Sequence, residues 1–242
     1  IRWRVMLDIK LNAVDLGFHN KPLFSALSLD ITQQRVALIG RNGAGKSQLV
    51  RLIAGLIRPD RGSVLVNGVE VGTNRRDALK TVGILFQNPD HQLIFPTVME
   101  ELCFGVQQQG HSRAQAQQMA QDMLQRFACA DWGPRVVHGL SQGQRHLVCL
   151  MAVLLMRPGL ILLDEPFAGL DMATTRRLGR YLHGLEQALL HVTHDLAAIT
   201  GYDRVIWLDH GQVVADGPPD TVLPHYRAHM VALGDGDAVA EL

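Results

Sequence analysis

The sequence predicts an α/β protein with a largely parallel sheet, on the strength of three observations. Aliphatic runs such as 36–39 and 160–163 are typical of strands buried on both faces of such a sheet. Segments with apolar residues at helical spacing lie between these runs. A glycine-rich loop at 40–47 joins the first run to one of the helical segments. We therefore expect strand–loop–helix units packed side by side.

Composition fits one domain or two closely joined lobes. The 242 residues are 47% hydrophobic, which suffices for a large core. Basic and acidic residues number 23 each, so the formal net charge is zero and gives no support for a nucleic-acid or anionic-membrane surface. Three widely spaced cysteines, Cys103, Cys129 and Cys149, are expected to be reduced, buried thiols in a cytosolic protein.

The sequence lacks a stretch with the length of a membrane span. The longest apolar run, 147–156, is ten residues long, whereas a helix that crosses a bilayer needs about 20. The N-terminal residues also lack the apolar region of a signal peptide. We therefore expect any role at a membrane to depend on a partner protein.

The glycine-rich loop has the pattern G-x-x-x-x-G-K-S of a phosphate-binding loop. It consists of Gly40, Arg41, Asn42, Gly43, Ala44, Gly45, Lys46 and Ser47, and Gln48 follows it. Glycines let successive backbone N–H groups face an anion, and the next helix adds its positive end. Lys46 is expected to reach the β- and γ-phosphates of a nucleotide, and the Ser47 hydroxyl to bind Mg²⁺. A chance glycine-rich turn is the alternative, but the flanking strand and helix favour nucleotide binding.

Strands are predicted on both sides of this loop. Residues 5–18 and 25–31 alternate apolar and polar positions, as half-buried strands do. Phe18, at a turn between them, could stack on an adenine ring or be an ordinary core residue. Turn residues around 63–66 indicate a hairpin, and a further strand is predicted at 82–86.

An ordered loop and two helices follow. Residues 87–97 carry two prolines and are predicted to be a loop. Thr97 is a candidate N-cap, with Glu100 completing a capping box. Helices are then predicted at 97–109 and 112–128.

The second half of the chain alternates helices and strands. The predicted helices cover 140–156 and 173–187, and the predicted strands cover 160–163, 188–193, 205–208 and 213–215. Residues 217–242 are expected to form a short helix and a loose tail.

Polar side chains follow the predicted strands at their C-terminal ends, where open α/β sheets bind their ligands. These residues are Gln87, Asp164, Glu165 and His194. Asp164 is placed to bind Mg²⁺ beside Ser47, and a second carboxylate, Glu165, could polarise an attacking water. A metal site at His191 and His194 is rejected, because strand residues three apart point to opposite faces and no cysteine or acid pair completes the site.

These pieces, in this order, resemble the ATP-binding cassette (ABC) ATPases over about residues 5–220. The matching motifs are the loop 40–47, Gln87, the signature Leu140, Ser141, Gln142, Gly143 and Gln144, the strand 160–166, the segment Ala168-Gly169-Leu170-Asp171, and His194. The resemblance implies a P-loop NTPase fold with a RecA-like core, an antiparallel β subdomain and a helical subdomain. The core lobe would cover about 1–86 and 158–225, the helical lobe about 87–157, and the loose tail 226–242.

The resemblance also implies roles for these residues. Phe18 looks like the aromatic that stacks on adenine, and residues 40–48 like those that hold the phosphates. The implied Mg²⁺ ligands are Ser47, Gln87 and Asp164, and the implied catalytic residues are Glu165 as general base, His194 as γ-phosphate switch, and Gln87. Ser141 and Gly143 resemble residues that contact ATP bound to the opposite subunit, and Asp171 one that crosses the interface. A homodimer around two ATP molecules is therefore expected.

One departure from the family pattern is relevant to structure. Gln142 replaces a glycine that is usual in the signature. If that position needs a positive φ, glutamine would strain the backbone there.

Within the family, residues 87–101 resemble the energy-coupling-factor importers, which take up vitamins such as biotin, or Co²⁺ and Ni²⁺. The implied contacts to a membrane partner are Gln92, Leu93 and Phe95, although local core packing is an equal alternative for the apolar pair. Residues 202–208 are most similar to the biotin type, and next to the cobalt type. The expected partners are a second ATPase subunit, a transmembrane coupling subunit and a substrate-binding membrane subunit, at the cytoplasmic face of the inner membrane.

Two other functions agree less well with the sequence. One is a soluble ABC ATPase of DNA repair, translation or cluster assembly. Against repair and translation stand the neutral charge, the single cassette, and the short segment between Gln87 and Leu140, which leaves no room for long coiled coils. A P-loop kinase for a small molecule would leave 140–144 and His194 without a role.

Overall fold

Two β-sheets enclose helix α1 (Lys46–Ile53) in the computed structural model, which describes residues 7–19, 21–167 and 169–234. The larger sheet has the strand order β10-β9-β3-β8-β7-β6. Its strands are β3 (Arg35–Ile39), β6 (Val82–Leu85), β7 (Leu160–Asp164), β8 (Ala188–Val192), β9 (Arg204–Asp209) and β10 (Gln212–Gly217). Five of them are parallel, and β10 pairs antiparallel with β9 at the edge.

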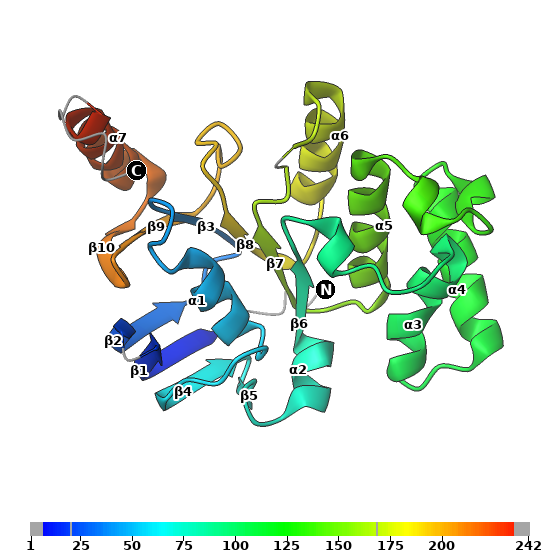
Figure 1. Cartoon of the computed structure of the whole chain (residues 1–242), viewed down its shortest axis with the longest axis horizontal. Coiled ribbons are helices and arrows are strands. Elements are labelled where there is room, and N and C mark those ends of the chain that lie inside the picture. Colours follow the sequence, from blue (N-terminus) through cyan, green and yellow to red (C-terminus); the bar gives the residue numbers. More distant parts are fainter. Residues whose placement is uncertain (1–6, 20, 168, 235–242) are drawn as a thin grey trace, which may run out of the picture.

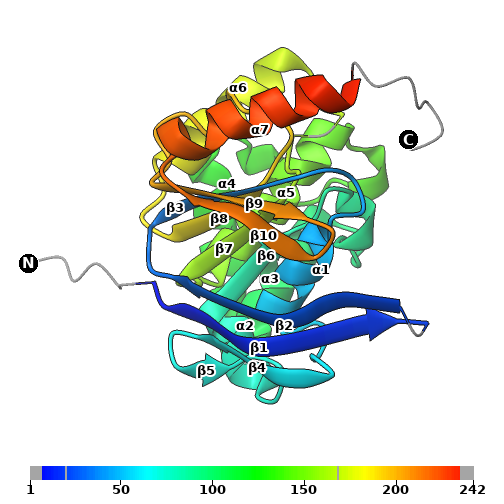
Figure 2. The same cartoon turned by 90° about the vertical axis from the view of Figure 1, so that its left-hand side faces the viewer.

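The smaller sheet is antiparallel, with the order β2-β1-β4-β5. Its strands are β1 (Ile9–Phe18), β2 (Lys21–Ile31), β4 (Arg61–Val66) and β5 (Val69–Glu70). Asn67 and Gly68, with φ of 50° and 78°, form the tight turn between β4 and β5, as the sequence predicts. Figure 2 shows this sheet below the larger one, with α1 between them.

One core joins the two sheets through α1. Its buried side chains come from both sheets and from one face of α1, including Leu49 and Leu52. The β7 run 160–163 is fully buried on both faces, which explains why its residues are all aliphatic. This arrangement confirms the predicted α/β class.

A layer of three helices lies beside the β6 edge of the larger sheet (Figure 1). The helices are α3 (Val98–Gln108), α4 (Arg113–Arg126) and α5 (Gln142–Leu155), and they share their own apolar core. Each begins with a complete capping box, at Thr97, Ser112 and Ser141 respectively. The predicted Thr97–Glu100 capping box is therefore confirmed. None of the described helices is long and apolar enough to span a bilayer.

The remaining helices show where the sequence prediction was incomplete. Helix α2 (Arg75–Thr81) was not predicted, and α6 (Met172–His183) ends at His183 rather than at 187. Helix α7 (Pro219–Gly234) is longer than expected.

The prediction of a loose tail from residue 226 is wrong for residues 226–234, because they belong to α7. Helix α7 is held because Tyr226 packs edge-to-face on Trp207 of β9, with ring centroids 5.3 Å apart. Figure 2 shows α7 lying across the end of the molecule that carries β9 and β10. The part of the predicted tail at 235–242 lies outside the described residues, as do 1–6 of the predicted core lobe.

Candidate nucleotide-binding site

The phosphate loop connects β3 to α1 at the C-terminal edge of the larger sheet. Gly40, Gly43 and Gly45 have φ of 147°, 80° and 101°, which only glycine adopts readily. At Gly40 a Cβ atom would lie 2.0 Å from the Leu208 carbonyl oxygen of β9, so a side chain cannot be accommodated. The loop therefore has the backbone pattern of an anion-binding nest, and it is backed by a neighbouring strand.

Lys46 is a buried cation inside this loop, with 6% of its surface exposed. Its Nζ donates to the carbonyl oxygens of Gly40 and Arg41, both at 2.8 Å. Burial lowers the pKa of Lys46, while the carboxylates of Glu165 and Asp164 oppose that shift. A positive charge is thus fixed where the loop closes.

The other predicted loop residues lie near Lys46 in the sequence and differ in burial. Asn42 is exposed and Ala44 is buried. Gln48 lies on α1, and its amide oxygen is buried with no hydrogen-bond partner among the described residues. Since an amide can also present its N–H₂ group, Gln48 is able to offer a donor at this position.

A strand-end cluster, consisting of Ser47, Gln87, Asp164, Glu165 and His194, gathers beside the loop. The Ser47 hydroxyl donates to Asp164 Oδ1 at 3.2 Å. Gln87 Nε2 donates to Glu165 Oε2 at 3.1 Å, and His194 Nε2 lies 2.6 Å from Glu165 Oε1. These residues end or follow β6, β7 and β8, or lie in the first turn of α1, so the parallel sheet brings together groups far apart in the sequence.

The two carboxylates of this cluster differ in their surroundings. Burial raises the pKa of Asp164, and the hydrogen bond from Ser47 opposes that rise. Glu165 has a left-handed backbone, with φ of 49°, and its N–H donates to the Val192 carbonyl oxygen at 3.0 Å. Glu165 is therefore held between the ends of β7 and β8 by its backbone as well as by its side chain.

The oxygen atoms of this cluster suit Mg²⁺ bound together with a phosphate. Mg²⁺ usually takes one or two protein oxygens and completes its shell with water and substrate phosphates. Ser47 Oγ and Asp164 Oδ1 supply such a pair. Among the described residues, no group of three His, Cys, Asp or Glu side chains could hold a metal by itself.

A signature cluster, consisting of Ser141, Gln142, Gly143, Gln144 and Asp171, lies at the adjoining ends of α5 and α6. Ser141 caps α5: its Oγ accepts from Gln144 N at 3.3 Å, and its N–H donates to Gln144 Oε1 at 2.8 Å. Asp171 caps α6 by accepting from Thr174 N and from the Thr174 hydroxyl, at 2.9 and 2.7 Å. These hydrogen bonds lower the pKa of Asp171.

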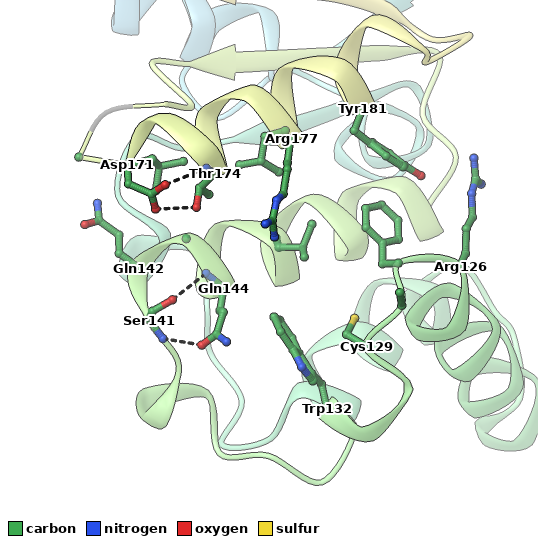
Figure 3. A pocket seen from close by; sticks show the side chains of 17 residues that line it. Arg126, Cys129, Trp132, Ser141, Gln142, Gln144, Asp171, Thr174, Arg177 and Tyr181 are labelled. Carbon is green, nitrogen blue, oxygen red and sulfur yellow. Dashed lines mark hydrogen bonds between the residues drawn. The ribbon is translucent and has the colours of Figure 1, made fainter.

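The two helix ends of the signature cluster touch. A Cβ atom on Gly143 would lie 2.9 Å from Thr174 Cγ2, so a side chain at this position would have to displace Thr174. Figure 3 shows this contact region on a cavity of about 790 Å³, with Trp132 and Arg177 among its walls. Among the described residues, no recorded hydrogen bond or ion pair joins Ser141 or Asp171 to Glu165.

The signature backbone tolerates its unusual glutamine. Gln142 is the first residue of α5 and is not among the residues with positive φ, so the strain considered from the sequence does not arise. Its amide lies against Gly169, where a Cβ atom would come within 2.8 Å of Gln142 Nε2. Leu140, the first residue of the motif, is buried. Ala168 lies outside the described residues.

Phe18 is the last residue of β1 and pairs with Lys21 across the turn. Its side chain is 44% exposed. The alternative of an ordinary core phenylalanine is therefore wrong, while stacking on adenine remains a prediction.

The backbone of the loop 87–97 is bound by a buried carboxylate, Glu101, which the sequence analysis did not identify as a site residue. Glu101 Oε2 accepts from the backbone N–H groups of Ile94 and Phe95, at 2.8 and 2.9 Å. Gln92 Oε1 accepts from Phe86 N at 3.4 Å. The sequence did offer a signal for this role: Glu101 is an acid among the apolar residues on the buried face of α3.

The apolar residues of this loop divide into packed and exposed side chains. Leu93 packs against two apolar cores, and the Phe95 ring lies 5.0 Å from that of Phe104. Ile94, between them, is 73% exposed. The surface that the loop offers therefore centres on Ile94 and the Phe95–Phe104 pair.

The fold and this site together define a P-loop nucleotide-binding protein with a signature-bearing helical layer. The chain belongs to the ABC transporter family, whose model matches residues 24–168. It is an ATPase of that family, as the resemblance implied.

Relatives and solved structures agree with this assignment. The chain is 50% identical, over 96% of its length and all of the relative, to the biotin transport ATP-binding protein BioM of Rhodobacter capsulatus. It is 34% identical to BioM of Rhizobium etli over 91% of this chain and 98% of that one. The structure matches cbiO1 of Clostridium perfringens, part of the ABC transporter complex cbiONQ, with a TM-score of 0.77 and 26% identity over 94% of this chain and 95% of that one.

A more distant match shows the fold alone. It is a dimeric post-hydrolysis state of the ATP-binding cassette MJ0796 bound to ADP and Pi, with a TM-score of 0.77 and 22% identity over 87% of this chain and 98% of that one.

Proposed function

We propose that the chain is the ATP-hydrolysing subunit of an energy-coupling-factor importer for biotin. One observation carries this proposal: identity of 50% over the whole length of a biotin transport ATP-binding protein. Cobalt or nickel uptake is the next candidate, supported by the structural likeness to cbiO1.

ATP would bind along the phosphate loop and across the strand-end cluster. Lys46 would exchange its two carbonyl acceptors for the β- and γ-phosphates, a gain of charge-assisted hydrogen bonds. Ser47, Asp164 and Gln87 would hold Mg²⁺, which would neutralise phosphate charge during hydrolysis. Phe18, exposed at the end of β1, would stack on the adenine ring.

Glu165 would be the general base for the attacking water. Its two carboxylate oxygens already have partners in Gln87 and His194, so its orientation is fixed before a water arrives. His194 would contact the γ-phosphate from the other side, and Gln87 would sense the same water or the metal. The three side chains would then respond together to hydrolysis.

A second copy of the chain would complete the site. Ser141 and Gly143 would contact the γ-phosphate of ATP bound to the partner, and Asp171 would cross the interface. The α5 N-terminus supports this role, since its N–H groups favour an anion and its capping serine is exposed.

The loop 87–97 would dock the transmembrane coupling subunit at the cytoplasmic face of the membrane. Gln92 and Glu101 would hold the loop in shape, and Ile94 and Phe95 would enter an apolar groove of the partner. A substrate-binding membrane subunit would complete the transporter.

The test is biotin uptake by cells that depend on this chain, together with mass spectrometry of what co-purifies from their membranes in mild detergent. Biotin uptake and two membrane subunits are the expected results. Uptake of Co²⁺ or Ni²⁺ alone would move the substrate assignment, and a soluble partner alone would contradict transport.

The docking surface is tested separately by Ile94→Asp. Because Ile94 is 73% exposed, the variant should fold and hydrolyse ATP but lose uptake and co-purification. Leu79→Asp on α2, at a residue 47% exposed, is the matched control and should keep both. Leu93→Asp is a poorer test, because Leu93 packs in the cores and its loss should destabilise the fold.

A further inference from the structure

A fully buried histidine lies in the helix that carries the signature. His146 on α5 is 0% exposed, next to the apolar residues Val148 and Cys149. A buried imidazole is costly unless its ring nitrogens find partners. Its two contacts therefore indicate why a polar residue occupies this position.

Both ring nitrogens of His146 face backbone carbonyl oxygens. Nδ1 lies 3.2 Å from Gln142 O, and Nε2 lies 3.1 Å from Gln87 O. Gln142 O is four residues earlier in α5, where the helix already gives it the His146 backbone N–H. For Gln87 O, no other donor is recorded in the described part of the chain.

The balance of these contacts selects one tautomer. A neutral imidazole has a single N–H to donate, so only one of the two carbonyl oxygens can receive a hydrogen bond from it. Placing the proton on Nε2 gives Gln87 O a donor, the only one that it has among the described residues, and leaves Nδ1 unprotonated beside Gln142 O. Placing it on Nδ1 would add a second donor to Gln142 O and leave Gln87 O unsatisfied.

Gln87 connects this hydrogen bond to the strand-end cluster. Its backbone carbonyl contacts His146, and its side chain donates to Glu165 at 3.1 Å. The same face of α5 also touches the loop that follows Gln87: Arg145 Nε lies 3.2 Å from Asp90 Oδ1, and Cys149 Sγ lies 3.9 Å from Pro89 O. A displacement of α5 must therefore move Gln87 and this loop together.

We propose that His146 is a positioning residue for ATP hydrolysis, whose Nε2–H donates to Gln87 O and couples the signature helix to the Gln87–Glu165 pair. Contact of Ser141, at the start of α5, with a second copy would then be transmitted to Glu165 through the His146 imidazole and Gln87. The inference rests on the proposed role of Glu165 as general base.

The test compares two variants of nearly equal size in the full-length chain. His146→Leu fills the space but donates nothing, and should lower the kcat of ATP hydrolysis about 10- to 100-fold, as loss of an orienting partner does. The KM for ATP should change by less than about twofold, because no contact to ATP is removed. His146→Gln, whose Nε2 is as many bonds from Cβ as the imidazole Nε2, should restore most of the kcat.

Cys149→Ala is the matched control, since it removes another contact between α5 and the same loop without touching Gln87. Its kcat should stay near that of the wild type. A wild-type kcat in His146→Leu would overturn the proposal, as would a His146→Gln variant that is as impaired as His146→Leu.

A spectroscopic measurement on the wild-type protein shows which ring nitrogen of His146 carries the proton. The ¹⁵N chemical shifts of His146 should show a protonated Nε2 and an unprotonated Nδ1, and the opposite tautomer would overturn the proposal even if the variants failed to fold. A Glu165→Gln variant with near-normal turnover would remove Glu165 as the base. The tautomer would still report independently on the contact between His146 and Gln87.

Discussion

The strand-end cluster and the signature cluster are built in opposite ways. In the strand-end cluster, the hydrogen bonds join residues far apart in the sequence, such as Ser47 with Asp164 and Gln87 with Glu165. In the signature cluster, the hydrogen bonds that hold Ser141 and Asp171 reach only three residues along the chain. The first cluster is thus a product of the whole fold, whereas the caps of the second are formed within each helix end. The difference fits the proposal that the first cluster acts on a ligand of its own chain and the second on a partner.

The largest effect is expected for Glu165→Gln, which tests whether the strand-end cluster works within one chain. Loss of the general base should lower the kcat about 10²- to 10⁴-fold. ATP should still bind, so that stalled dimers accumulate. Phosphate release and size-exclusion chromatography in ATP measure both results, and near-normal turnover would rule Glu165 out as base.

Lys46→Ala tests the phosphate loop of the same chain. A charge-assisted hydrogen bond contributes about 1.5–3 kcal/mol, so the loss of even one should raise the Kd for ATP at least about 10- to 150-fold. Lys80→Ala, at an exposed residue of α2, is the control for loss of charge and should bind ATP normally. Isothermal titration gives both constants; an unchanged Kd in Lys46→Ala would refute its contact with phosphate.

A smaller effect is expected for His191, which lies on β8 three residues before His194. It tests the stability of the strand and not the chemistry of the strand-end cluster. Burial lowers the pKa of His191 from 6.5 to about 4, so the folded state binds this proton more weakly than the unfolded state does. The stability it provides is present above about pH 6.5 and is lost as the pH falls towards 4.

Between about pH 7.5 and pH 5 this loss amounts to about 2 kcal/mol in the free energy of unfolding. His191→Gln cannot titrate and can still form a hydrogen bond with the Tyr202 hydroxyl, which lies 3.0 Å from His191 Nδ1 in the wild type. Urea unfolding at both pH values should show a weaker pH dependence in the variant. The same dependence in both proteins would show that His191 is not the titrating group.

The smallest effect is expected for a pair of serine variants, which tests the difference between the strand-end cluster and the signature cluster most directly. Ser141→Ala and Ser112→Ala each remove the serine of a capping box in the helical layer, and each should cost about 1 kcal/mol of stability. Only Ser141→Ala should also lower the kcat, by about tenfold if one hydrogen bond to a partner's phosphate is lost.

Binding of ATP to the isolated chain should be unchanged in both serine variants. If Ser141→Ala weakened that binding, the signature cluster would act within its own chain, and the contrast between the clusters would fail. Thermal unfolding of the two variants measures the loss of stability, ATP titration measures binding to the isolated chain, and turnover gives the kcat.

Local signals in the sequence were sufficient for most of the scaffold. The aliphatic run 160–163, the turn at Asn67-Gly68 and the Thr97 capping box each depend on neighbouring residues alone. Helix α7 was cut short because its anchor, Trp207, lies on β9 and cannot be read from the helix itself. Helix α2 was missed because it is short and sits beside exposed turns.

The same distinction applies to the site. Polar residues after buried strands predicted that Gln87, Glu165 and His194 would meet, because parallel strands end at one edge. Glu101 and His146 were not assigned, since their partners are backbone atoms of a loop whose path depends on tertiary packing. Side chains that act on a loop backbone leave no spacing pattern in the sequence.

The left-handed backbone at Glu165, with φ of 49°, has a consequence for laboratory evolution. This conformation costs an ordinary L-residue about 1–2 kcal/mol and glycine almost nothing. Folding alone therefore favours glycine or asparagine at position 165. A population selected only for heat resistance should lose the glutamate, and one selected for growth on scarce substrate should keep it. The residue recovered at this single position would thus report which of the two pressures had acted.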